Sequence, residues 1–151
     1  MKSITVQVGY SQLAVFNCQM DRPLNMWTRR HVQQGFSWRE GSVSFKTLEE
    51  DCELVVKLDL VDKFPPIHQK SAQVIEVPFV VGAHGIEIGS VTASEAASIP
   101  EGKYELRIEL LDGARIALLW FSPKEKTRFN VVKLHQTSEP PIDLILTTEP
   151  A

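Results

Sequence analysis

The sequence has 151 residues, a length that favours one domain with an apolar core of its own. Its hydrophobic fraction of 43% and charged fraction of 23% are those of an ordinary soluble globular protein. The 16 basic and 19 acidic side chains give a net charge of -3, which argues against a protein built to grip nucleic acid. That balance fits a basic partner, and it also fits plain solubility.

Alternation of apolar and polar residues with a period of two is the main pattern along the chain, and it predicts strands with one buried face. The first two alternating runs extend from Ile4 to Tyr10 and from Leu13 to Phe16. A short helix is predicted next, over residues 28–34. Thr28 is its expected N-cap, and Gly35 is the residue expected to end it.

Further alternating runs follow at residues 43–45, 53–60, 75–81, 86–88 and 104–110. Pro78 lies inside one of them and predicts an edge strand or a bulge there, because proline has no amide hydrogen to give to a neighbouring strand. The segment TASEAAS, residues 92–98, predicts one further turn of helix.

The pair Asp112–Gly113 predicts a hairpin, because a type I′ turn needs residues that tolerate positive φ. The returning strand, residues 115–121, is apolar on both faces and is therefore expected to be central. A further strand is predicted at 129–134, and Leu144 and Leu146 form either a last edge strand or a frayed end. These elements predict an all-β fold, an antiparallel β-sandwich or jelly-roll-like single domain, over residues 1–136, followed by a C-terminal tail at 137–151.

No motif of covalent or metal chemistry stands out. The four histidines are isolated from one another and from other metal ligands in the sequence, and the glycine patterns of nucleophile elbows and phosphate loops are missing. Cys18 and Cys52 are not part of a CxxC pair and are expected to be buried free thiols, although one bridge between them stays open. The prediction is a protein that is not an enzyme and holds no metal or cofactor.

The N-terminal residues MKSITVQVGY do not have the long apolar stretch of a signal peptide. The longest apolar run, residues 116–121, is far shorter than a membrane span. A cytoplasmic location is therefore expected, with any membrane association indirect and through a partner.

Four carboxylates, those of Glu49, Glu50, Asp51 and Glu53, cluster between two predicted strands. They form either a solvated turn or an acidic patch that docks on a basic surface. The basic residues are divided between two distant groups, at 29–30 and 124–128, so direct binding of nucleic acid is not expected.

The stretch GFSWREGSVSF, residues 35–45, contains two aromatic residues and an Arg–Glu pair just before a strand. Trp27, Phe36 and Trp38 are expected to seal one end of the sandwich, since aromatic side chains bury large areas. Alternatively, Trp38 and Arg39 stay partly exposed as an interface anchor, because Trp and Arg dominate binding hot spots.

Five segments in order, PLNMWT, GFSWREGSVSF, EVPFVV, GIEIGSV and IPEGKYELRIE, resemble the competence protein J family. The resemblance extends from about Leu13 to Leu110. It rests on the following positions: Trp27, Thr28, Gly35, Phe36, Gly41, Ser44, Phe45, Pro78, Phe79, Gly85, Ile86, Ile88, Pro100, Gly102 and Tyr104. Most of these are turn glycines, prolines and core aromatics, so the resemblance transfers mainly the fold.

The resemblance implies a bacterial inhibitor of a DNA-entry nuclease, associated with competence and DNA uptake. The nuclease would be the protein partner, and its site would be blocked by stoichiometric occlusion. The candidate patches are the carboxylates at 49–53 and the corner formed by Trp27, Trp38 and Arg39. A small-ligand-binding β-sandwich, for a sugar or a fatty acid, is the alternative, and it requires a concave apolar pocket.

Overall fold

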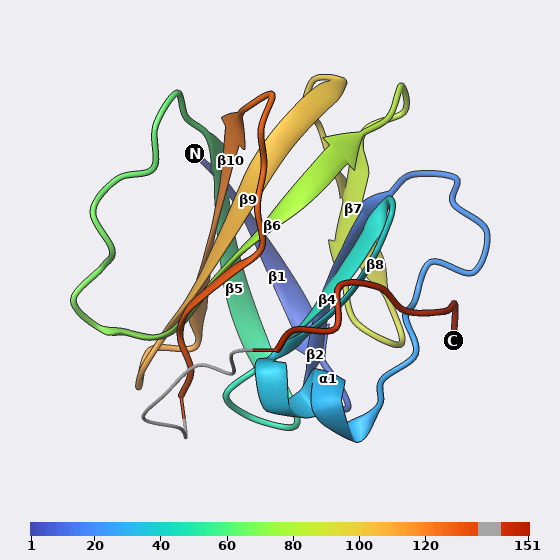
Figure 1. Cartoon of the computed structure of the whole chain (residues 1–151). Helices are drawn as coiled ribbons and strands as arrows, with labels where there is room; N and C mark the ends of the chain where they lie inside the picture. The colour runs from blue at the N-terminus through green and yellow to red at the C-terminus, as the bar shows by residue number, and fades with distance from the viewer. Residues whose placement is uncertain (136–142) are drawn as a thin grey trace.

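The computed structural model describes residues 1–135 and 143–151, and it shows two β-sheets packed face to face (Figure 1). The six-stranded sheet contains, in spatial order, β1 (Lys2–Val8), β5 (Cys52–Leu60), β10 (Ile116–Pro123), β9 (Gly102–Leu111), β6 (Ser71–Val81) and β11 (Asn130–Lys133). The five-stranded sheet contains β3 (Phe36–Arg39), β4 (Ser42–Lys46), β2 (Gln12–Asn17), β7 (Ile86–Gly89) and β8 (Ser94–Ala97). The predicted all-β sandwich is confirmed.

Alternation places one face of each sheet in a shared core. In β1 every second residue from Ile4 onward is buried, whereas β6 and β9, of eleven and ten residues, are buried on both faces over most of their length. The largest side chains that are completely buried are aromatic or branched: Phe36, Phe45, Phe79, Phe121, Leu13, Ile75, Ile86, Ile88, Leu106, Ile108, Leu110 and Leu119. The core therefore comes from both sheets.

The strand β10 lies between β5 and β9, as its apolar faces predicted. It is antiparallel to β9 but parallel to β5, with Ile116 opposite Val55, so the sandwich is not antiparallel throughout. The connection from β5 to β6, residues 61–70, crosses the outer face of this sheet past β10 and β9, because β6 lies on the far side of both strands.

The predicted helix is confirmed as α1 (Arg29–Gln34). The side chain of Thr28 accepts the backbone N–H of His31, and the Nδ1 atom of His31 accepts the backbone N–H of Thr28 in return, at 3.0 Å. Gly35 ends the helix with a φ of 88°, a left-handed conformation that favours glycine.

Two local predictions were wrong. Residues 94–97 form the strand β8, which pairs with β7, and not a helical turn, because a neighbouring strand overrides the weak helix propensity of this segment. The hairpin at Asp112–Gly113 exists, but its turn spans four residues, 112–115. Positive φ occurs at Gly113 and Arg115, so it is not a two-residue type I′ turn.

Pro78 lies in the long strand β6, which is one strand away from the sheet edge. The neighbouring strand β11 ends its pairing at Glu76, opposite Asn130, so β6 has no partner strand on that side at Pro78. The missing amide hydrogen therefore breaks no pairing. The bulge in β6 lies between Ser71 and Gln73 and not at the proline.

The described end of the tail, residues 143–151, packs along the segment that leads into α1. The side-chain amide of Gln34 exchanges two hydrogen bonds with the backbone of Ile145, at 2.8 and 2.9 Å. An isolated β-bridge joins Asn25 to Pro150, and no strand forms at Leu144 or Leu146. The predicted boundary between the domain and its tail, at 136 and 137, lies outside the described residues.

Candidate functional site

Several turns meet at the end of the sandwich where α1 lies, which we call the helix end (Figure 1). They are the β1–β2 turn at 9–11, the β4–β5 turn at 47–51 and the β9–β10 turn at 112–115. The first two turns are bonded together, because the backbone N–H of Ser11 donates to the carbonyl of Glu50 and that of Thr47 donates to the carbonyl of Ser11, both at 2.9 Å. The helix end is therefore one continuous surface.

The predicted acidic cluster lies on this surface. Glu50, Asp51 and Glu53 are exposed, whereas the carboxylate of Glu49 receives two hydrogen bonds from Arg115, at 2.8 and 3.0 Å. The same bonds raise the pKa of the Arg115 guanidinium. The free negative charge of the turn therefore resides on Glu50, Asp51 and Glu53.

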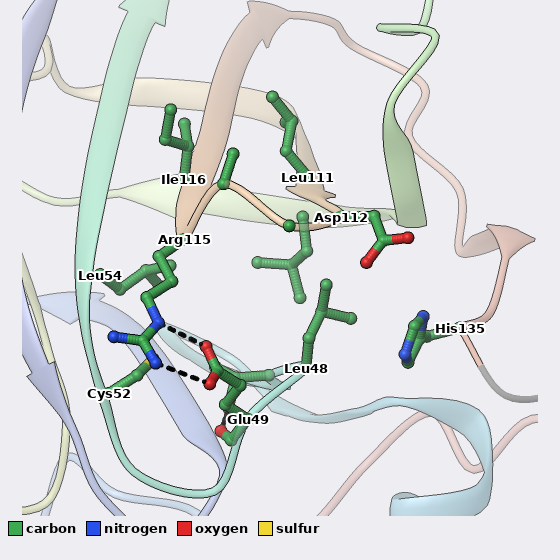
Figure 2. Close-up of a pocket in the computed structure, with 13 residues that line it drawn as sticks. Leu48, Glu49, Cys52, Leu54, Leu111, Asp112, Arg115, Ile116 and His135 are labelled. Atoms are coloured by element: carbon green, nitrogen blue, oxygen red, sulfur yellow. Dashed lines mark hydrogen bonds and ion pairs between the residues drawn. The ribbon is translucent and has the colours of Figure 1, made fainter.

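A cavity of about 430 Å³ opens beside the acidic turn, between the β4–β5 and β9–β10 turns (Figure 2). Its apolar lining comes from the six-stranded sheet, with Leu54 on β5 and Leu110 on β9, and from Leu48 in the β4–β5 turn. Figure 2 shows the Glu49–Arg115 pair at one side of the cavity and the side chains of Asp112 and His135 at the other. An apolar interior with a charged rim is the composition of a small-molecule pocket.

Trp27 also lies at the helix end, just before α1, and is half-buried. Its indole meets the ring of His31 edge-on, at 6.5 Å between centroids. The indole Nε1 is buried and has no hydrogen-bond partner among the described residues. Trp27 therefore combines an apolar face with an unused donor, as aromatic residues at interfaces often do.

Trp38 is not part of this surface. Its indole donates to the carbonyl of Pro78 at 2.7 Å and packs edge-on against Phe129, so it seals the gap between the edges of the two sheets. Arg39 lies at the opposite end of the β3–β4 hairpin from α1, and its Nε donates to Asn25 Oδ1 at 2.8 Å. Burial, followed by the charge of Arg22, lowers the pKa of Arg39. The structure thus brings Trp27 close to the acidic turn but places Trp38 and Arg39 elsewhere.

A buried charge cluster on the outer face of the six-stranded sheet was missed by the sequence reasoning. Glu76, Glu105 and Glu109 are at most 4% exposed. Arg107 binds Glu76 at 2.8 Å and lies 4.0 Å from Glu109, while Lys124 binds Glu105 at 2.8 Å. The only signal in the sequence was the order Glu, Arg, Glu at alternate positions of one predicted strand, which allows cross-strand ion pairs.

The crossing segment 61–70 covers part of this cluster. The guanidinium of Arg107 lies 4.3 Å from the centre of the Phe64 ring and donates to the carbonyl of Pro65 at 2.8 Å. Glu109 accepts the backbone N–H of His68 at 2.8 Å and the indole N–H of Trp120 at 2.9 Å. Apart from Glu105 Oε1, which has no hydrogen-bond partner among the described residues, the carboxylates of the cluster are bonded internally, so the cluster mainly holds the fold together.

Both cysteines are free thiols, and Cys52 is buried. Burial raises the pKa of both thiols from their ordinary value of 9.0, and nearby carboxylates raise it further, Glu87 for Cys18 and Glu49 for Cys52. The thiolate, which is the reactive form, is therefore disfavoured in the folded protein.

We expect Cys52 to react with iodoacetamide far more slowly in the folded protein than in 6 M urea at pH 8, because the fold both covers the sulfur and raises its pKa. A folded pKa above the unfolded one gives stability that is complete below the ordinary value of 9.0 and is lost as the pH rises beyond it. Mass spectrometry of timed samples measures the rates. Equal rates in the two states would show that Cys52 is accessible.

Among residues 1–135 and 143–151, no group of three or more His, Cys, Asp or Glu side chains could hold a metal ion. No helix in this part of the chain has the length and apolar character to cross a membrane.

Comparison with known proteins gives a consistent result. The sequence model of the competence protein J (ComJ) family matches residues 5–131. The solved structure of ComJ from Bacillus subtilis, described as an inhibitor of the DNA degrading activity of NucA, matches with a TM-score of 0.69 and 21% sequence identity, over 82% of this chain and 96% of that chain. Comparison with curated protein sequences gave no match. Because the family match covers most of the sequence and the folds agree, the chain belongs to the competence protein J family.

Proposed function

We propose that the chain is a non-catalytic inhibitor of a nuclease and acts by stoichiometric occlusion of the nuclease site. The observation that carries the proposal is the family match over residues 5–131. The fold shared with ComJ of Bacillus subtilis, which inhibits the DNA degrading activity of NucA, supports it. The same proposal places the chain in the cytoplasm, where its two free thiols would stay reduced.

The helix end is the proposed docking surface. A nuclease attracts phosphate, so the mouth of its site is electropositive. The free carboxylates of Glu50, Asp51 and Glu53 can pair with such a mouth, and Trp27 lies on the same end of the sandwich. The side chains of Trp38 and Arg39 make internal hydrogen bonds, so in this proposal they support the fold and do not contact the partner.

The test is a titration of the purified chain into digestions of plasmid DNA by a nuclease panel. The panel consists of NucA of Bacillus subtilis and the purified nucleases encoded in the genome that carries this chain, the one encoded next to it first. The expected result is loss of digestion by at least one member close to one-to-one stoichiometry. Unchanged digestion by every member would overturn the proposal.

Reversing two charges of the acidic turn, in the double variant E50K/D51K, is expected to weaken inhibition about tenfold at low salt, since it places like charges opposite the nuclease. The loss shrinks as salt is added, because screening weakens exposed charges. The matched control is E101K/E125K, two exposed carboxylates at the opposite end of β9 and β10 from Asp112. Equal inhibition by both double variants would exclude the acidic turn as the contact.

A small-ligand-binding protein is the second candidate, and the cavity of about 430 Å³ at the helix end favours it. Pockets for small molecules have volumes of about 300–1,000 Å³. The discriminating measurement is thermal unfolding of the chain with sugars or fatty acids added. A Tm that goes on rising with the logarithm of ligand concentration would support this candidate, because binding to the folded state shifts the unfolding equilibrium in that way.

A further inference from the structure

The β1–β2 turn contains residue types that are unusual for its backbone conformation. Tyr10 and Ser11 both have positive φ, 55° and 59°, and Gln12 N donates to the carbonyl of Gly9 at 3.3 Å. Two central residues with positive φ define a type I′ turn, for which Asn-Gly and similar pairs are strongly preferred. Elsewhere in the described residues, positive φ without glycine occurs only at isolated positions. Strained backbone of this kind concentrates at functional sites.

The surrounding structure fixes this turn firmly. Ser90 accepts the backbone N–H of Gly9 at 3.0 Å, and its hydroxyl lies 2.7 Å from the carbonyl of Gln12. On the other side, Ser11 exchanges backbone hydrogen bonds with Thr47 and Glu50. The Tyr10 side chain nevertheless projects into solvent and is 75% exposed, the highest value for a large apolar side chain in the described residues. A rigid backbone that presents a free tyrosine loses little entropy on binding.

A pocket of about 290 Å³ lies beside Tyr10, lined also by Ser11, Gln12, Trp27, Val32 and Lys46. Two lining residues carry a buried polar atom without a partner among the described residues, Gln12 Oε1 and Trp27 Nε1. Unsatisfied buried polar atoms are rare in folded proteins and call for an explanation. A partner side chain that enters the pocket can supply the missing hydrogen bonds.

We infer that Tyr10 is the anchor of the docking surface at the helix end and that the basic mouth of the nuclease seats on it; this inference rests on the proposed function. Charge complementarity identifies the occupant. The carbonyl of Glu50 is bonded to Ser11, so the exposed carboxylates of Glu50 and Asp51 lie directly beside the Tyr10 turn. In this arrangement the Tyr10 side chain inserts into the nuclease. The pocket beside Tyr10, which Trp27 lines, receives a side chain of the nuclease, and the carboxylates of Glu50 and Asp51 pair with cations of the nuclease.

The test uses glycine substitutions at positions where the backbone is strained. Y10G and Q19G each place glycine at a position of positive φ, so both are expected to raise Tm relative to the unchanged chain. Only Y10G removes the anchor, because Gln19 follows the end of β2 that lies away from the helix end. Y10G is expected to weaken inhibition of the responsive member of the nuclease panel by about 30-fold, the size of a hot-spot loss, whereas Q19G stays within about twofold. Y10F keeps the ring and is expected to retain most of the inhibition.

The outcomes separate the two proposals. Inhibition by Y10G equal to that of the unchanged chain would overturn the anchor and leave the proposed function standing. Equal losses in Y10G and Q19G would also overturn it, since the relief of backbone strain and not the loss of the ring would then matter. If the unchanged chain inhibits no member of the panel, the proposed function falls, and the anchor falls with it.

Discussion

Replacing Arg107 with alanine is expected to lower the free energy of unfolding by about 3–5 kcal/mol, the range for breaking a buried ion pair by removing one partner. The guanidinium binds Glu76 through two nitrogens, both at 2.8 Å, and lies 4.0 Å from Glu109. Without it, two carboxylates that are 4% and 0% exposed lose their main cation. Arg128, 3.9 Å from Glu76, offsets part of this loss, so the lower end of the range is expected.

The same substitution also loosens the crossing segment 61–70. Arg107 is stacked on Phe64 and bonded to the carbonyl of Pro65, so alanine removes these two contacts, while the bond from His68 to Glu109 remains. Urea unfolding followed by tryptophan fluorescence measures the change. The matched control is R115A, which removes an equally short bidentate pair with Glu49, but one in which both side chains are largely exposed. Its effect is expected to be small. Equal losses in the two variants would contradict the role assigned to burial.

Replacing Phe121 with alanine is expected to cost about 3–5 kcal/mol, because it leaves a cavity in a tightly packed core. Phe121 is 0% exposed, and its ring meets those of Phe79 and Tyr104 edge-on, at 6.2 and 5.8 Å between centroids. The substitution therefore removes packing contacts between β10 and two other strands, β6 and β9. The control is V80A on β6 of the same sheet, where the side chain is 46% exposed and the change is expected within about 0.5 kcal/mol. A similar midpoint of urea unfolding for both variants would show that the core relaxes around the gap.

The fold could be predicted from the sequence because a strand with one buried face leaves a pattern of period two. The run IALLWF illustrates the limit of that pattern. Its two apolar faces predicted a central strand, and β10 is central, with Phe121 in the core. The parallel pairing of β10 with β5 could not be predicted, because it joins distant parts of the sequence and no local pattern encodes it.

The buried charges show why alternation misleads. Glu105, Arg107 and Glu109 alternate with apolar residues, as the solvent face of a strand does. A face covered by a crossing segment has the same pattern, provided that opposite charges neutralise one another. The contacts with Phe64, Pro65 and His68 distinguish the two cases, and they come from another part of the chain.

The candidate site was only partly predictable for a similar reason. The acidic turn stands out in sequence as a cluster, and Trp27 as an aromatic residue at the start of a helix. Tyr10 gives no signal, since it continues the alternation of the first strand and the Tyr-Ser pair is not a usual type I′ turn. Its prominence depends on hydrogen bonds to residues 47, 50 and 90, which tertiary structure alone brings together.

The parallel neighbour of β5 has a consequence for how the protein is made. During synthesis β5 emerges early and pairs with β1, but the strand that covers its other edge, β10, is translated much later. Until then the nascent chain presents an unpaired edge of a long, half-apolar strand, the kind of template on which chains aggregate. Ribosome-bound intermediates that stop before Ile116 are therefore expected to aggregate more readily than the folded protein, and a topology so rich in distant pairings is expected to fold slowly.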